Sequence, residues 1–422
     1  MSKIIVAATP LTGHTMPLLA VARGLGGRGH DVTVLAGSRF HRQATATGAH
    51  VVDLSGGADF DDTDLNAAFP GRAQRAPGPE QLNFDIAHLF ADTIPAQHEA
   101  LQKLLLDGAE TVLFDPYFLG AWPVLLGAPG IRPRRTVAVG MSVLTQLTDS
   151  TTLTGPIPGV HGEEATAAHR AANAGLRAAL SPGQDHLARV LADVGARREA
   201  PFFLDGLIAL PDRYAQLTVE GFEFAADDAP ASVRFVGPVP PAESAGYVRP
   251  SWWAELDQRP VVVVTQGTLA SEDLELLISP TLEALADEDV LVIATVGRDV
   301  NRLDGAVPAN ARVEEFVPYD LLLPHADALV TNGGYGGVQM ALAADVPIVV
   351  GGATEDKPFV AARVAAFGVG IDLGPAPAPE NIRTAVREVL ANPSFKKAAA
   401  PIRAAIEKSD PFGAIEELII GD

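Results

Sequence analysis

The chain has 422 residues, 47% of them hydrophobic, which is enough to bury the cores of two or three domains. It has no cysteine, so disulfides, thiolate metal sites and a cysteine nucleophile are excluded, and we expect a reducing, cytoplasmic location. The formal net charge of −21 argues against nucleic acid or anionic lipid as a main partner, and no apolar run approaches the ~18 residues of a membrane span.

The first half of the chain alternates strand-like apolar segments with helix-like segments. We expect strands at 4–8, 31–35, 50–54, 111–114 and 135–139, and helices at 17–26, 80–106 and from 118. This alternation predicts a parallel sheet with helices on both faces. The polar stretch 55–79 is too long to be a simple connector. A second irregular stretch, 141–162, is rich in threonine, proline and glycine, and alanine-rich helices follow it to about Arg198.

The alternation restarts after a proline-punctuated segment at 235–241, which we interpret as an interdomain linker. Strands are expected at 261–265, 290–294, 328–330 and 348–350, and helices at 273–286 and 380–390. The sequence therefore predicts an α/β fold with two Rossmann-like domains that face each other across a cleft. Their expected limits are residues 1–237 and 246–402, with a linker at 238–245 and a C-terminal helix, 403–422, that packs back on the first domain.

Asn332-Gly333-Gly334 follows one of the apolar strands and precedes a helical pattern. A strand, a glycine-rich turn and a helix in this order direct backbone N–H groups and a helix N-terminus at one spot, which suits a phosphate. The alternative is that the glycines serve only a tight turn. The run 24–29 also fits a dinucleotide-binding glycine pattern, but it follows a helix and precedes a strand, so we interpret it as a helix end.

His14 and Asp115 are the candidates for acid–base chemistry. His14 lies after the first strand at the start of a helix, where the helix dipole favours the neutral imidazole that can accept a proton. Asp115 follows the strand at 111–114, and its carboxylate can reach the imidazole if the two strands are neighbours. The alternative for each residue is capping of a helix start. No Gly-x-Ser-x-Gly elbow is present, so a nucleophile would have to come from the substrate.

In their order and spacing these residues resemble the inverting family-1 glycosyltransferases of GT-B fold, in particular the bacterial branch that glycosylates macrolides and other natural products. Gly13-His14-x-x-Pro17 resembles the catalytic-histidine turn of that family, and Asp115 stands at the place of its orienting aspartate. Phe316-Val317-Pro318 resembles the entry to the donor-binding box, with a phenylalanine in place of the base-stacking tryptophan. The resemblance implies these donor-binding residues: Gly13, Thr268, Phe316, Val317, Asn332, Gly334, Gly336, Gly337, Asp356 and Lys357.

The sequence departs from the family pattern at four of these donor positions or beside them. Asn332 replaces the histidine that donates to the diphosphate, and Gly337 replaces a serine or threonine at the helix start. Met340 replaces the glutamate that holds the ribose diol, which removes a strong hydrogen-bond acceptor. Lys357 replaces a glutamine, so it either adds a cation near the sugar diphosphate or is simply solvated.

An acceptor pocket is expected from the stretches 55–79 and 141–162 and from four apolar residues, which are Phe84, Phe118, Trp122 and Met141. The acidic run 59–62 is interpreted as a solvated turn, so we expect no metal site and no cofactor beyond the sugar donor.

The resemblance implies transfer of a hexose, with inversion, from a UDP- or dTDP-sugar to a hydroxyl of a small hydrophobic natural product. UDP-glucose is the first candidate donor, and His14 is the general base assisted by Asp115. Two other functions stay open: a nucleotide-sugar epimerase of the same fold, and a non-catalytic nucleotide-sugar binder. The paired histidine and aspartate favour a transferase over a binder, because a binder has no use for a base. We expect a monomer or homodimer that inserts in no membrane.

Overall fold

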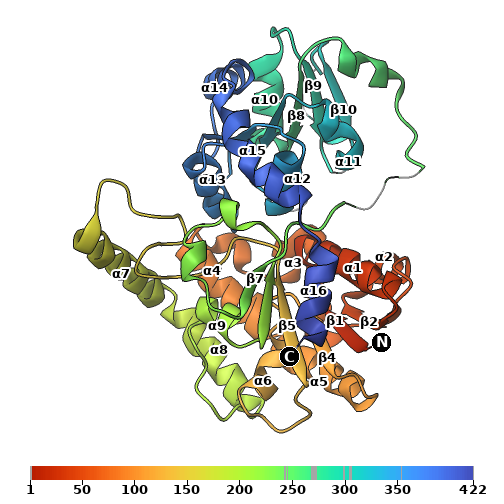
Figure 1. The fold of residues 1–422 in the computed structure, drawn as a ribbon, viewed down its shortest axis with the longest axis vertical. Helices are drawn as coiled ribbons and strands as arrows, with labels where there is room; N and C mark the ends of the chain where they lie inside the picture. Colours follow the sequence, from red (N-terminus) through yellow and green to blue (C-terminus); the bar gives the residue numbers. More distant parts are fainter. Residues whose placement is uncertain are drawn as a thin grey trace. The chain divides into compact units, whose positions relative to one another are not determined.

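The computed structural model describes residues 2–241, 244, 246–267, 273–297, 300–303, 307–352 and 354–421, and Figure 1 shows the fold. The chain divides into two compact units. Unit 1 comprises Met1–Leu217, Phe224–Val239 and Asp410–Asp422, and unit 2 comprises Thr218–Glu223 and Pro240–Ser409. The expected limits differ from these in two places. Residues 218–223 belong to unit 2, and the chain returns to unit 1 at Asp410 rather than at residue 403.

Unit 1 is built on a parallel sheet whose strands lie in the order β3-β2-β1-β4-β5-β6-β7. The strands are β1 (Lys3–Ala7), β2 (Asp31–Ala36), β3 (His50–Asp53), β4 (Thr111–Phe114), β5 (Arg135–Gly140), β6 (Arg213–Gln216) and β7 (Val233–Phe235). The order reverses between β1 and β4, which are paired with Ala7 opposite Phe114. In open α/β sheets ligands bind at the carboxyl ends of strands at such a switch point.

Both faces of the unit 1 sheet are buried, because alternate residues of each strand point to opposite faces. Ile4 and Val6 pack with residues of α1 and α16, whereas Ile5 and Ala7 pack with residues of α5. In Figure 1 the dark-blue helix α16 lies beside α1, although the two are at opposite ends of the chain. The helices of unit 1 are α1 (Thr12–Gly27), α2 (His41–Thr45), α3 (Leu65–Ala68), α4 (Pro79–Phe84), α5 (Ile94–Leu106), α6 (Trp122–Leu125), α7 (Gly162–Ala179), α8 (Ser181–Asp193), α9 (Phe203–Ala209) and α16 (Pro411–Ile420).

Unit 2 repeats this plan with the strand order β10-β9-β8-β11-β12-β13, all parallel, and the switch point lies between β8 and β11. The strands are β8 (Val261–Thr265), β9 (Leu291–Thr295), β10 (Ala311–Glu314), β11 (Ala328–Thr331), β12 (Ile348–Val350) and β13 (Gly370–Asp372). The helices are α10 (Ile278–Leu285), α11 (Tyr319–Leu322), α12 (Tyr335–Ala343), α13 (Lys357–Ala366), α14 (Pro379–Ala391) and α15 (Ser394–Glu407). Residues of α10 and α14 cover one face of this sheet.

The predicted fold class is confirmed, since each unit is a parallel sheet with helices packed against it. Four strands, β6, β7, β10 and β13, were not predicted, because they are short and carry no clear alternation. The expected helix at 80–106 is interrupted, with α4 passing into a π-helix, η5 (Asp85–Ala91), before α5. None of the helices in the described ranges combines the length and the hydropathy that crossing a membrane requires.

Short 3-10 helices occupy much of the remaining chain, including the stretch 55–79. They are η1 (Ser38–Phe40), η2 (Gly56–Ala58), η3 (Asp62–Asp64), η4 (Arg72–Gln74), η6 (Leu119–Ala121), η7 (Glu220–Phe222), η8 (Ala226–Asp228), η9 (Ser251–Asp257), η10 (Leu274–Leu276), η11 (Val300–Arg302) and η12 (Leu323–His325).

Candidate functional site

The candidate catalytic pair lies at the switch point of the unit 1 sheet. His14 is in the first turn of α1, which follows β1, and Asp115 directly follows β4. Because β1 and β4 are adjacent and parallel, both side chains emerge at the same edge of the sheet. Nδ1 of His14 lies 3.0 Å from Oδ1 of Asp115, and the two side chains are 19% and 0% exposed. The contact expected from the two strand ends is therefore confirmed.

Asp115 is held by more than the histidine. Its Oδ2 accepts the N–H of Thr9 at 2.6 Å, and its Oδ1 also accepts the N–H of Tyr117 at 2.8 Å. These bonds compensate for burial of the carboxylate and fix its orientation. Because a carboxylate only accepts, the facing Nδ1 of His14 carries a proton, and in the neutral ring Nε2 holds the lone pair. The bond to Tyr117 closes a local turn and is not the helix cap considered as the alternative, because the next helix, η6, begins at Leu119 without a side-chain cap.

A second carboxylate, Asp62, anchors the first turn of α1. The sequence predicted a solvated acidic turn at 59–62, but Asp62 is only 2% exposed, so that prediction is wrong for this residue. Its Oδ2 accepts the first N–H of the helix, from Thr12, at 2.5 Å, and its Oδ1 accepts from Arg39. The residue before the helix is Leu11, which makes no side-chain cap. Asp62 therefore supplies the missing cap from a distant loop.

Tyr117 is the aromatic residue that approaches the histidine. Its ring meets the imidazole of His14 edge-on, with centroids 5.1 Å apart. On its other side it contacts the rings of Phe90 and Phe203, at 5.1 and 6.0 Å. From the sequence, the next residue, Phe118, was expected in the acceptor pocket instead. The alternation of apolar and polar residues does not show which side chain of a turn faces the ends of the strands. Tyr117 therefore lines the candidate catalytic pair.

Two of the four predicted acceptor residues belong to the core instead. Phe118 and Trp122 are both 0% exposed, so neither presents a surface to a ligand, and their assignment to the acceptor pocket is corrected. Met141 is 8% exposed and packs on the α1 face of the sheet. Phe84 is half-buried, with its ring 4.6 Å from that of His88. Contacts of Phe84 and Met141 with an acceptor stay predictions.

The irregular stretch 141–162 is fastened to the following helix, α7. Nδ1 of His169 donates to the carbonyl of Asp149 at 2.9 Å, and Nε2 accepts the N–H of Ile157 at 3.0 Å. The amide of Asn173 donates to two further carbonyls of the stretch, at 2.9 and 3.0 Å. The conformation of this stretch is therefore set by buried side chains of α7 and not by its own sequence alone.

The glycine-rich turn of unit 2 lies at the switch point of its own sheet, between β11 and the start of α12. Gly333 has φ +94°, and a Cβ there would lie 3.0 Å from Cγ2 of Val350, so the fold itself requires this glycine. Among the described residues, no atom outside the local chain would lie closer than 3.8 Å to a Cβ added at Gly334, Gly336 or Gly337. Packing within the described part of the chain does not require these three glycines, which leaves room for a ligand beside the first N–H groups of α12.

Asn332, expected to donate to a diphosphate, is part of the framework of this turn. Its Nδ2 donates to the carbonyl of Gln266, which ties the end of β11 to the end of β8. Its Oδ1 is buried and has no partner among the described residues. That oxygen is an acceptor and does not suit an anion, so a contact with diphosphate would have to use the second N–H of the amide.

Lys357 was expected either to face the diphosphate or to be solvated, and the solvated alternative is wrong. Its side chain is 7% exposed, and its Nζ pairs with the carboxylate of Glu355. Glu355 has φ +58°, which is uncommon for a residue other than glycine. The cation is therefore buried with its charge already matched. Asp356 occupies the N-cap position of α13 and is half-buried.

The remaining predicted donor residues differ in exposure. Phe316, after β10, is 69% exposed, as stacking against a base requires. Val317 is 0% exposed, so only its main chain is available, and a side-chain contact is excluded. Gly13 is exposed, and a Cβ there would meet nothing within 4 Å. Thr268 lies outside the described residues.

Tyr319 is a residue of this region that the sequence did not single out. Burial raises the pKa of its phenol, whereas hydrogen bonds with Thr265 and Thr295, at the ends of β8 and β9, act in the opposite direction. Its ring lies beside the first turn of α12, where a Cβ at Gly337 would be 3.8 Å from Cε2. Tyr319 therefore joins the carboxyl ends of two strands to the glycine-rich turn. The signal that could have found it was its place directly after Phe316-Val317-Pro318.

Known proteins are similar to this chain over nearly its whole length. Residues 279–417 match the C-terminal domain of erythromycin biosynthesis protein CIII-like proteins. The chain is 36% identical over 435 residues to UDP-glucosyltransferase A1 of Starmerella bombicola, which covers 99% of this chain and 91% of that relative. It is 37% identical over 429 residues to 4′-demethylrebeccamycin synthase of Lentzea aerocolonigenes, which covers 100% of this chain and 99% of that relative. Among solved structures, the glycotransferase of kitacinnamycin matches with a TM-score of 0.74 at 22% identity over 99% of both chains, which shows the GT-B fold.

Proposed function

Because this chain belongs to the family of UDP-glucosyltransferases and natural-product glycosyltransferases of GT-B fold, we propose that it transfers a hexose from a nucleoside-diphosphate sugar to a hydroxyl group of a small hydrophobic natural product. The single observation that carries the proposal is the contact of His14 with the buried Asp115 at the switch point of unit 1. A protein that only binds nucleotide sugars would gain nothing from a histidine whose proton position is set by a carboxylate. The absence of cysteine supports a cytoplasmic setting for the reaction.

In the proposed reaction the acceptor oxygen attacks the anomeric carbon while the bond from that carbon to the diphosphate oxygen breaks. The hydroxyl proton passes to Nε2 of His14, and Asp115 stabilises the imidazolium that forms. A single displacement inverts the anomeric centre, so an α-linked donor yields a β-linked product. Tyr117 and the loop fastened to α7 would contact the acceptor.

The leaving diphosphate would be received by the N–H groups at the start of α12, with Gly334, Gly336 and Gly337 giving it room to approach. Backbone dipoles directed at the developing charge can supply stabilisation that a metal ion supplies in other transferases. We therefore expect transfer to need no added metal, and a chelator should leave the rate almost unchanged. Loss of activity with EDTA that Mg²⁺ restores would contradict this part of the proposal.

The expected choice of donor nucleotide rests on Met340, which is half-buried in α12. Its thioether is a weak acceptor that gains little from a ribose diol. The neighbouring Gln339 does not replace the missing carboxylate, because it is 2% exposed and its amide is anchored inside the unit by the bond from Nε2 to Thr218 at 2.8 Å, so it presents no surface to a ribose diol. We therefore propose that dTDP-sugars are accepted beside UDP-sugars. The ratio of kcat/KM for UDP-glucose and dTDP-glucose tests this, and a preference for UDP above ~100-fold, equal to ~2.7 kcal/mol, would contradict it.

One experiment separates the proposed transferase from its two alternatives. Purified protein is incubated with a panel of nucleotide sugars, with and without phenolic and macrocyclic acceptors, and the products are identified by mass spectrometry and NMR. A transferase forms a glycoside only when an acceptor is present. Consumption of the donor without acceptor would indicate an epimerase, and donor binding without any turnover would indicate a binder.

A further inference from the structure

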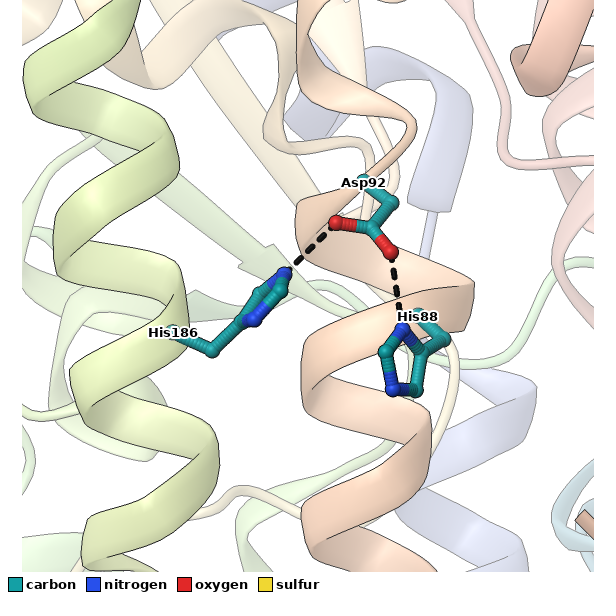
Figure 2. A group of neighbouring side chains, drawn as sticks. All are labelled: His88, Asp92 and His186. Carbon is teal, nitrogen blue, oxygen red and sulfur yellow. Dashed lines mark hydrogen bonds and ion pairs between the residues drawn. The ribbon is translucent and has the colours of Figure 1, made fainter. Parts of the chain in front are cut away.

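Outside the sites described above, three metal-ligating side chains converge on the surface of unit 1. Figure 2 shows His88 and Asp92 on one helical segment and His186 on α8, with both imidazoles directed at the carboxylate. Nδ1 of His88 lies 2.8 Å from Oδ2 of Asp92, and Nε2 of His186 lies 2.6 Å from Oδ1. The ligand atoms of all three residues lie within 4.8 Å of one another. We propose that His88, Asp92 and His186 form a binding site for a divalent transition metal of the Zn²⁺ class.

The backbone around the three residues is held in place without a metal. His88 and Asp92 are four residues apart and so project from the same side of their helix, at the end of the π-helix η5. Gly183 allows α8 to approach closely, since a Cβ there would lie 3.0 Å from both Asn83 and Ile86. The side chain of Asn83 also accepts the N–H of Gly183 at 2.8 Å. His186 lies three residues further along α8, so its position relative to η5 is fixed by packing.

The chemistry of the three ligands selects the class of metal. Two imidazole nitrogens and one carboxylate oxygen suit Zn²⁺, Co²⁺, Ni²⁺ or Cu²⁺, whereas Mg²⁺ and Ca²⁺ prefer oxygen ligands alone. The side chains of His88, Asp92 and His186 are 44%, 45% and 26% exposed, so water can complete the coordination. The strongly negative net charge of the chain also attracts cations.

The geometry needs side-chain rotations to receive an ion. Metal bonds of about 2.0–2.1 Å at a tetrahedral angle place two donor atoms about 3.3 Å apart. The two histidines now contact different oxygens of Asp92, at 2.8 and 2.6 Å, and the three ligand atoms lie within 4.8 Å of one another. Short contacts must therefore open by roughly 0.5–0.7 Å and the widest separation must close by up to ~1.5 Å, which rotation of these partly exposed side chains can provide. Each ring N–H that faces Asp92 gives up its proton, to the other ring nitrogen or to solvent, so that a lone pair faces the metal. Binding would then join α8 to the helical segment that carries Phe84 and His88.

The three ligands are not among the residues that the proposed transfer reaction uses. The proposed base, His14, and Asp115 also belong to unit 1, and the residues expected to receive the diphosphate belong to unit 2. The predicted acceptor residue Phe84 is a neighbour of the site, with its ring 4.6 Å from that of His88. The chain also offers a matched control. His41 and Asp53 form an exposed histidine–aspartate contact at 2.9 Å, and among the described residues no third ligand joins them in a possible metal site. A two-ligand contact of this kind is expected to bind zinc more weakly than three converging ligands.

The test uses the full chain without a polyhistidine tag, freed of metal with EDTA and then desalted. Isothermal titration calorimetry with ZnCl₂ should show one saturable site, and the Tm should rise with zinc concentration because the ion binds the folded state. Since loss of even an outer partner weakens a metal site by about 10–100-fold, His88→Gln, Asp92→Asn and His186→Gln should each weaken binding at least about tenfold. His41→Gln should leave the strong binding unchanged.

A second measurement addresses the coordination directly. Co²⁺ added to the metal-free protein should give visible absorption bands that Zn²⁺ abolishes and that are missing in Asp92→Asn. Circular dichroism checks that the variants, all at exposed or half-buried positions, keep the fold. The proposal is overturned if the wild type binds zinc no more tightly than Asp92→Asn, if His41→Gln removes the strong site, or if millimolar Mg²⁺ displaces the zinc. In those cases the cluster is a carboxylate hydrogen-bonded by two histidines.

Discussion

Replacement of His14 and of Asp115 should have effects of different size, and the structure allows both to be worked out. His14→Ala removes the proposed base, and a positioned general base contributes about 10²–10⁴-fold, or ~2.7–5.5 kcal/mol of the barrier. Asp115→Asn keeps an acceptor for Nδ1 of His14 if the amide oxygen takes the place of Oδ1. It replaces a charge-assisted hydrogen bond of ~1.5–3 kcal/mol by a neutral one of ~0.5–1.5 kcal/mol, so we expect about a tenfold loss.

Asp115→Asn should also lower the free energy of unfolding, and this loss of stability must be measured separately from the loss of rate. The oxygen that becomes NH₂ in Asp115→Asn now accepts the N–H of Thr9 at 2.6 Å in a fully buried position. Two donors would then face each other, and a buried donor without an acceptor costs ~1–3 kcal/mol. The side chain of His14 is 19% exposed, whereas that of Asp115 is fully buried, so His14→Ala should be milder in stability and more severe in rate.

The assay is single-turnover formation of glycoside from UDP-glucose and a hydroxyl acceptor, with donor affinity from calorimetry and stability from urea unfolding. His41→Ala is the matched control, because it removes an exposed histidine that also contacts an aspartate, at 2.9 Å. Donor affinity should be unchanged in all variants. If His14→Ala transferred sugar within about tenfold of the wild type, the proposed general base would be wrong.

Gly336→Ala should keep the Tm and weaken binding of the donor nucleotide in calorimetry, because its methyl, in the first turn of α12, would meet none of the described residues within 4 Å. Gly333→Ala should instead destabilise the fold by ~1–2 kcal/mol, since alanine is strained at φ +94°; equal Tm values for the two variants would contradict this. Asp62→Ala should cost ~0.5–2 kcal/mol in urea unfolding because α1 loses its cap, and an unchanged midpoint would show that the cap is unimportant. Burial lowers the pKa of His98 in the folded protein, although its hydrogen bond to a backbone carbonyl opposes the effect. As the pH falls below 6.5, this histidine is therefore protonated first in the unfolded chain, and the free energy of unfolding decreases. The decrease in Tm between about pH 8 and pH 5.5 should therefore be smaller in His98→Gln, and an identical decrease would exclude this histidine as a cause.

The sequence by itself determined the features that depend on neighbours along the chain. The runs 261–264 and 112–114 are continuously apolar because both faces of a parallel strand are buried, and the structure has strands at 261–265 and 111–114, as predicted. The turn at Asn332–Gly334 was also readable, since φ +94° at Gly333 needs glycine. His14 and Asp115 could be named in advance as candidates for a pair, because each follows a strand and parallel strands end at one edge of a sheet.

Tertiary structure alone decided what depends on which distant segments meet. Periodicity could not order the strands, so the contact of His14 with Asp115 remained conditional until β1 was found beside β4. Asp62 is buried because it caps the first turn of α1, through a bond to the N–H of Thr12, fifty residues earlier in the chain. The local pattern of an acidic run cannot predict so distant a partner. Local patterns also do not give the direction of each side chain in a turn, which is why Tyr117 and not Phe118 meets the histidine. The physical reason is common to these cases: hydrophobic patterning sets local structure, whereas burial and the pairing of charges are settled only when remote segments pack together.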